Sequence, residues 1–145
     1  MLRTVPLLLA VVALSGCAST IKTLDGEHLL VGSSQFRDHV ANVFKRHNST
    51  LTVLFDVHEQ VDAEDAVRLD IAEQRMIEAC ETLNSAAAAQ RDGKVPSARI
   101  LLTISSTISA CDQATDDADQ LIREISPSSL PAISEDEPLK QTVSW

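Results

Sequence analysis

A long stripe of apolar and small residues at helical spacing covers residues 97–125. Its members recur every three or four positions, as one face of a packed helix requires: Leu101, Ile104, Ile108, Cys111, Thr115, Ala118, Ile122 and Ile125. A second stripe follows the acidic start at residues 62–65: Ala66, Leu69, Met76, Cys80, Leu83 and Ala87. Residues 91–93 supply a helix stop and residues 93–96 a short turn. The two stripes predict an antiparallel helical hairpin.

A third helical pattern begins at Ser33 or Ser34, either of which can cap it. Its face contains Phe36, Val40, Val43, Phe44 and His47. The polar residues 48–50 predict a break, and residues 50–57 fit either a strand or a continued helix. We favour the helix, because the chain offers no second strand to pair with a first one.

These patterns predict an all-α domain over residues 34–125, with residues 34–61 closing the elongated hairpin into a three- or four-helix bundle. Residues 126–145 are rich in Ser and Pro and contain three consecutive acids at 135–137, so we expect a disordered tail. Its last residue, Trp145, is either a docking element or an uninformative terminus.

The N-terminus has one positive charge, Arg3, and then an apolar run over residues 5–14, which is typical of a secretory signal peptide. The next residues, Leu14-Ser15-Gly16-Cys17, resemble the lipobox of bacterial lipoproteins. The resemblance implies a signal peptide over residues 1–16, cleavage after Gly16 and a diacylglyceryl group on Cys17. Residues 17–33 would then be a lipidated tether. The alternative is an ordinary signal peptide followed by a chance cysteine.

The resemblance also implies a location, the bacterial cell envelope, with membrane attachment through acyl chains on Cys17. Ala18 stands where Asp would favour retention at the inner membrane, so we expect the outer membrane. Cleavage would remove Arg3 from the 12 basic residues, leaving 11 against 21 acidic residues and a formal net charge of −10. So acidic a protein is a poor nucleic-acid partner, because phosphate binding needs a basic face.

With Cys17 assigned to the lipid, Cys80 and Cys111 form an even pair in an oxidising compartment. Facing residues of an antiparallel hairpin are equally distant from its turn, and the midpoint of these two falls within residues 93–96. Both cysteines also belong to the apolar stripes. We therefore predict a Cys80–Cys111 disulfide, the alternative being two buried thiols.

The remaining polar residues show no pattern typical of catalysis, and we predict neither an enzyme nor a cofactor site. His28, His39, His47 and His58 lack the spacing of a zinc site, so we expect them at the surface or its boundary. Four aspartates, Asp112, Asp116, Asp117 and Asp119, fit a solvated acidic face better than a cation site, since no calcium-binding loop surrounds them.

Two functions remain open for such a chain. The first is a lipid-anchored module that binds an envelope protein or has a structural role, with a partner docking between residues 34–61 and the hairpin. The second is an envelope protein that binds a small ligand or a metal ion through its histidines and aspartates. Convergence of His39, His47 and the aspartates would favour the second.

Overall fold

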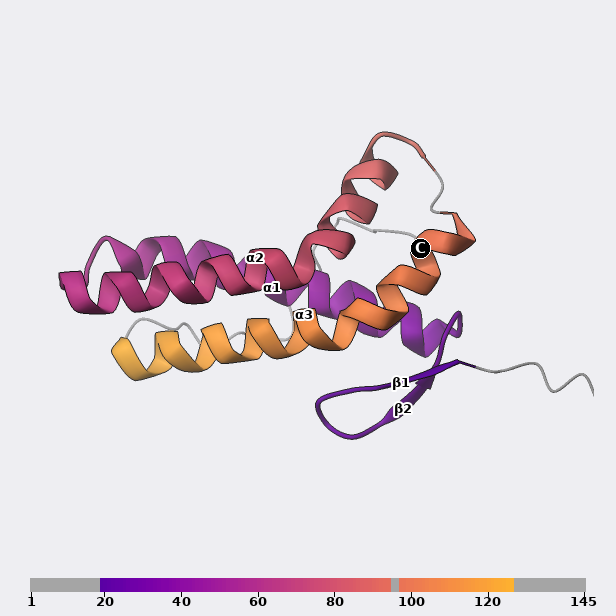
Figure 1. Ribbon diagram of the computed structural model, residues 1–145, viewed down its shortest axis with the longest axis horizontal. Coiled ribbons are helices and arrows are strands. Elements are labelled where there is room, and N and C mark those ends of the chain that lie inside the picture. The colour runs from indigo at the N-terminus through magenta and orange to yellow at the C-terminus, as the bar shows by residue number, and fades with distance from the viewer. Residues whose placement is uncertain (1–18, 95–96, 127–145) are drawn as a thin grey trace, which may run out of the picture.

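The computed structural model describes residues 19–94 and 97–126 (Figure 1). Its elements are β1 (Thr20–Lys22), β2 (His28–Leu30), α1 (Ser34–His58), α2 (Ala63–Arg91) and α3 (Ala98–Ile125). The predicted helical character is confirmed, but a small two-stranded sheet accompanies the helices. The predicted signal peptide, the predicted lipidation site at Cys17 and residues 127–145 of the predicted tail, with Trp145, lie outside the described residues.

Each helix begins after a residue whose side-chain oxygen accepts backbone N–H groups of the first turn. These residues are Ser33, Asp62 and Ser97. At the end of α2, Gly93 has φ +75°, a conformation that glycine adopts without a steric penalty. The Lys94 N–H then donates to Ala89 O, which satisfies a carbonyl of the last helical turn. The predicted helix boundaries therefore follow from local capping.

The break predicted at residues 48–50 is wrong, because α1 continues without interruption from Ser34 to His58. Asn48 Nδ2 donates to Phe44 O at 2.7 Å, and Thr52 Oγ1 donates to Asn48 O at 3.1 Å. These contacts to the preceding turn satisfy polar side chains within a helix. Residues 50–57 are therefore helical, with Leu54 and Val57 buried.

Each of the three helices packs against the other two. The core consists of apolar side chains from all three, with Leu54, Leu69, Met76, Leu83, Ile104, Ile108 and Ile122 among the largest. Figure 1 shows α2 and α3 running in opposite directions, and their ends nearest the connecting loop bend away from the remaining helices. In α3 the hydroxyls of Ser105, Ser106 and Thr107 bond to carbonyls of the preceding turn, which favours such bending.

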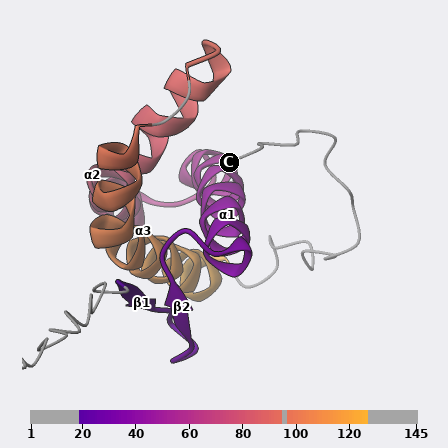
Figure 2. The ribbon, with the colours of Figure 1, turned by 90° about the vertical axis from the view of Figure 1, so that its right-hand side faces the viewer.

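The segment predicted as a tether folds instead into an antiparallel hairpin from residue 20 onward, with Thr20 opposite Leu30 and Lys22 opposite His28. Ile21 and Leu29 point inward and are buried. The hairpin contacts α1 through β2 and α3 through β1, and Figures 1 and 2 show α2 on the far side of these helices. The expectation that the chain lacks a second strand was wrong because three-residue strands are too short to show a clear alternation.

Candidate functional site

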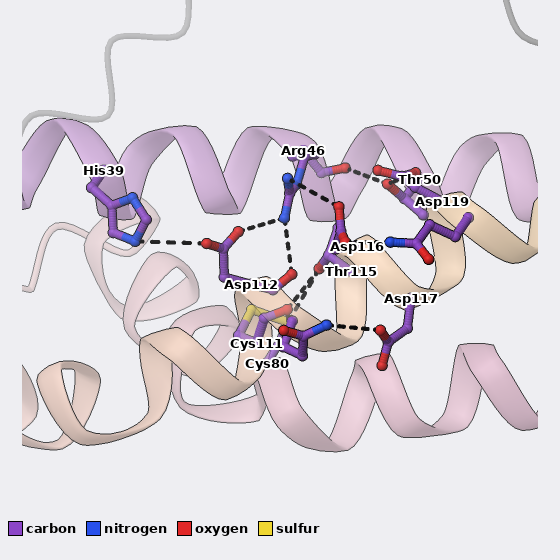
Figure 3. A network of polar contacts seen from close by, with 12 residues as sticks. His39, Arg46, Thr50, Cys80, Cys111, Asp112, Thr115, Asp116, Asp117 and Asp119 are labelled. Atoms are coloured by element: carbon purple, nitrogen blue, oxygen red, sulfur yellow. Dashed lines mark hydrogen bonds and ion pairs between the residues drawn. A yellow bond between two sulfur atoms is a disulfide. The ribbon is translucent and has the colours of Figure 1, made fainter. Parts of the chain in front are cut away.

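The principal polar cluster among the described residues lies between α1 and α3 (Figure 3). The Arg46 guanidinium of α1 donates through Nη2 to a carboxylate oxygen of Asp112, and also to the Asp112 main-chain carbonyl at 2.9 Å. Its Nη1 lies 3.9 Å from Asp116 Oδ1. One arginine therefore contacts both the backbone and two carboxylates of the facing helix.

Asp112 is the most buried acid of this cluster, with its side chain 8% exposed. Burial raises the pKa of its carboxyl above the ordinary value, while the charges of Arg46 and His39 act in the opposite direction. His39 Nε2 lies 3.9 Å from Asp112 Oδ2. The solvated acidic face predicted for this helix is thus wrong at Asp112, which is an interhelical ion-pair partner. Asp117 does match that prediction, being exposed and bonded to Gln113 at 2.8 Å.

A second contact joins the same helices one turn further along. Thr50 Oγ1 lies 2.7 Å from Asp119 Oδ1 and 3.0 Å from Arg46 O. Burial raises the pKa of Asp119, and the hydrogen bond from Thr50 partly offsets that effect. Asp119 is half-buried rather than solvated. The α1–α3 interface therefore has polar contacts at both Asp112 and Asp119 beside its apolar core.

The Cys80 and Cys111 sulfur atoms form a disulfide with an S–S distance of 2.05 Å and a Cα–Cα distance of 4.6 Å. The bond joins α2 to α3 at the position that the midpoint rule predicts. Cys111 directly precedes Asp112, and Thr115 Oγ1 donates to Cys111 O at 2.9 Å. The covalent link to α2 and the ionic link to α1 thus meet at one turn of α3 (Figure 3).

His47 is fully buried, so its expected place at the surface or boundary is wrong. Its Nε2 lies 3.2 Å from Asn84 Nδ2 of α2. Burial lowers the pKa of His47, since an imidazolium would lose its hydration there. The sequence contained the relevant signal, because His47 shares a helix face with Val40 and Val43. The other histidines are half-buried or exposed.

Within the described ranges, no group of three or more His, Cys, Asp or Glu side chains converges as a metal site would require. His39 approaches Asp112, but His47 faces Asn84, and His58 pairs with Asp70 at 3.0 Å. The Asp112 carboxylate already has the Arg46 cation beside it. These polar side chains instead join the helices: Arg46 pairs α1 with α3, and His47 pairs α1 with α2.

An apolar strip lies on the side of α2 that faces away from its buried residues. It consists of Val67 and Ile71, one helical turn apart and 57% and 48% exposed; we call it the outer face of α2. The predicted docking position for a partner is the space between α1 and the pair of helices α2 and α3. Core side chains such as Val43 and Leu54 fill that space instead. The sequence signal for the outer face is that Val67 and Ile71 lie opposite Leu69 in helical projection.

No protein-family model, curated protein or solved structure matches this chain. Among the helices of the described residues, none combines the length and hydropathy needed to cross a bilayer. The candidate sites therefore rest on the residues and geometry given above.

Proposed function

We propose that this protein is a lipid-anchored helical lipoprotein of the bacterial cell envelope that binds a protein partner. The lipobox at residues 14–17 supports the anchor. A Cys80–Cys111 disulfide supports an oxidising compartment. Mutual packing of α1, α2 and α3 supports a closed three-helix bundle. The outer membrane is the proposed site, because Ala18 follows Cys17.

The observation that carries the binding role is the outer face of α2. Exposed charged residues such as Asp70 and Glu78 border it. Contiguous exposed apolar residues with a polar rim are typical of protein interaction sites. A helix or strand of an envelope protein is the partner that such a narrow strip fits.

Intact mass of the membrane-extracted protein tests the anchor and the compartment together. We expect cleavage after Gly16, a diacylglyceryl adduct on Cys17, and protection of Cys80 and Cys111 from alkylation until a reductant is added. An unacylated chain with freely alkylated thiols would contradict the proposal.

Site-specific photo-crosslinking in living cells tests the binding surface. A photoreactive amino acid at Ile71 should give one adduct of defined mass, and the exposed position Thr52 on α1 is the control. The adduct should disappear when Val67→Glu is combined with the label at residue 71. Equal adducts from both positions, or an adduct insensitive to Val67→Glu, would contradict a specific surface on α2.

The alternative, an envelope protein that binds a small ligand or metal ion, gains no support from the described residues. A ligand that binds Asp112 would have to displace Arg46 from its carboxylate. His47 is bonded to Asn84 of α2 and does not take part in that cluster. We therefore favour the protein-binding role.

A further inference from the structure

The proposed lipid anchor and the folded domain are separated by very little chain. Only Ala18 and Ser19 stand between Cys17 and Thr20, the first residue of β1. An extended chain covers at most ~3.6 Å per residue, so the Cα atoms of Cys17 and Thr20 lie within about 11 Å of each other. A lipid on Cys17 would therefore hold β1 close to the bilayer.

The strand next to the anchor is fixed to the rest of the domain. Ile21 is buried, and Ser109 Oγ of α3 donates to the Lys22 carbonyl at 3.1 Å. Arg37 of α1 donates to the Gly32 carbonyl just after β2 at 3.0 Å. Because the hairpin does not hang on a loose linker, its position near the bilayer sets the orientation of the whole helical domain.

The side of the hairpin that points away from the helices carries no acidic residue on its strands, while the turn beyond Lys22 holds the exposed acids Asp25 and Glu27. Its strand residues are Thr20, Lys22, His28 and Leu30, all exposed, and the turn adds the exposed Leu24. None of the four strand residues is acidic, although the chain has a formal net charge of −9. Leu30 pairs directly with Thr20, so an exposed apolar side chain lies at the anchored end.

We propose that this outer face of the hairpin rests on the surface of the bilayer, with Leu24 and Leu30 between the lipid headgroups and Lys22 beside their phosphates. The inference rests on the proposed acylation of Cys17. Acyl chains already confine the domain to the bilayer, so two exposed leucines and one lysine need only select an orientation. In that orientation α2 is the helix farthest from the membrane, because it lies on the far side of α1 and α3 from the hairpin (Figures 1 and 2).

The test uses the full-length acylated protein in vesicles of phosphatidylethanolamine and phosphatidylglycerol. An environment-sensitive fluorophore is attached to the new cysteine of Leu30→Cys or Leu24→Cys. Labelling is specific because the acyl group blocks Cys17 and the disulfide blocks the other two native cysteines. Ile71→Cys is the matched control, since Ile71 and Leu30 are each 48% exposed and Ile71 belongs to α2, which lies on the far side of α1 and α3 from the hairpin (Figures 1 and 2). Quenching by lipids with a spin label near the headgroup should be several-fold greater at residues 30 and 24 than at residue 71.

Flotation and intact mass of the same samples distinguish the possible failures. Vesicle-bound, acylated protein with equal quenching at residues 30 and 71, or with stronger quenching at residue 71, would overturn the membrane-facing hairpin while leaving the anchor intact. Protein that neither floats with the vesicles nor carries the acyl mass would overturn the proposed anchor, and the inference with it.

Discussion

Arg46 is the residue whose contacts connect α1 to α3 at the turn that bears the disulfide. Replacing Arg46 by Met (Arg46→Met) leaves the Asp112 carboxylate buried without its hydrogen-bonded cation, and we expect a loss of about 2 kcal/mol in the free energy of unfolding, because Arg46 itself is partly exposed. Replacing both partners, in Arg46→Met with Asp112→Leu, should be less destabilising than Arg46→Met alone. Urea unfolding of the two variants measures the difference.

The matched single variant Asp112→Leu completes a double-mutant cycle with these proteins. Coupling between the two positions is the expected outcome, because the two side chains share a hydrogen-bonded ion pair. If the effects of the single variants simply add, the ion pair does not contribute to the packing of α1 on α3.

His47 makes stability depend on pH in a defined direction. Burial lowers its pKa in the folded protein, whereas in the unfolded chain the pKa is near 6.5. As the pH falls below 6.5, the unfolded chain binds a proton that the folded protein resists, so the free energy of unfolding decreases until the lowered pKa is passed. We expect His47→Gln, which keeps an amide for Asn84, to lose less stability than the native protein over this range.

Two carboxyls oppose this effect as the pH falls. Burial raises the pKa of Asp112 and of Asp119 above 3.8, so the folded protein takes up these protons before the unfolded chain does. Their protonation therefore increases stability as the pH falls through the raised values. Chemical denaturation at a series of pH values separates the two ranges; identical profiles for the native protein and His47→Gln would show that His47 does not control the loss near pH 6.

At the scale of elements, the β1–β2 hairpin is part of the packed core. Leu29 is 5% exposed and packs toward the helices, while its neighbour Leu30 is 48% exposed. We expect Leu29→Ala to lower the free energy of unfolding by about 2–4 kcal/mol and Leu30→Ala by at most about 0.5 kcal/mol. Thermal or urea unfolding of this matched pair checks the prediction, and equal effects would mean that the hairpin does not pack on α1 and α3.

The disulfide is the covalent constraint on α2 and α3. It closes a loop with a sequence separation of 31 residues, which corresponds to at most about 3–4 kcal/mol in the chain-entropy description. Cys80→Ala with Cys111→Ala should lower the free energy of unfolding toward that limit. Adding a reductant should then destabilise the native protein but not the double variant; a response in both would point to another cause.

For the whole molecule, the main prediction concerns the anchor. A Cys17→Ser variant produced from residue 17 onward has neither a thiol to acylate nor the apolar run 5–14, so we expect it in the aqueous phase of a detergent-partition assay, whereas the acylated protein enters the detergent phase. The acidic surface, with a formal net charge of −9, adds no attraction for anionic lipids. Retention of Cys17→Ser in the detergent phase would show that another part of the chain binds the membrane.

Local patterns in the sequence were sufficient for the helices, the cap of α1 at Ser33 and the Cys80–Cys111 pairing. Each of these depends on residues close together in the chain or on the symmetry of one short turn. The α1 break failed as a prediction because polar side chains at residues 48–52 can bond to the preceding helical turn. Whether the helix continues through these residues depends on burial of the opposite face of α1, and local helix propensity carries no information on that burial.

What the sequence by itself determined is the helical content and the spacing of the two apolar stripes. Only the tertiary structure decided that Asp112 pairs with Arg46, that His47 is buried against Asn84, and that Ile21 and Leu29 pack beneath the helices. These contacts join residues far apart in the chain. Whether a charged or polar side chain is buried depends on the element that packs over it, and that information arises only when the helices meet.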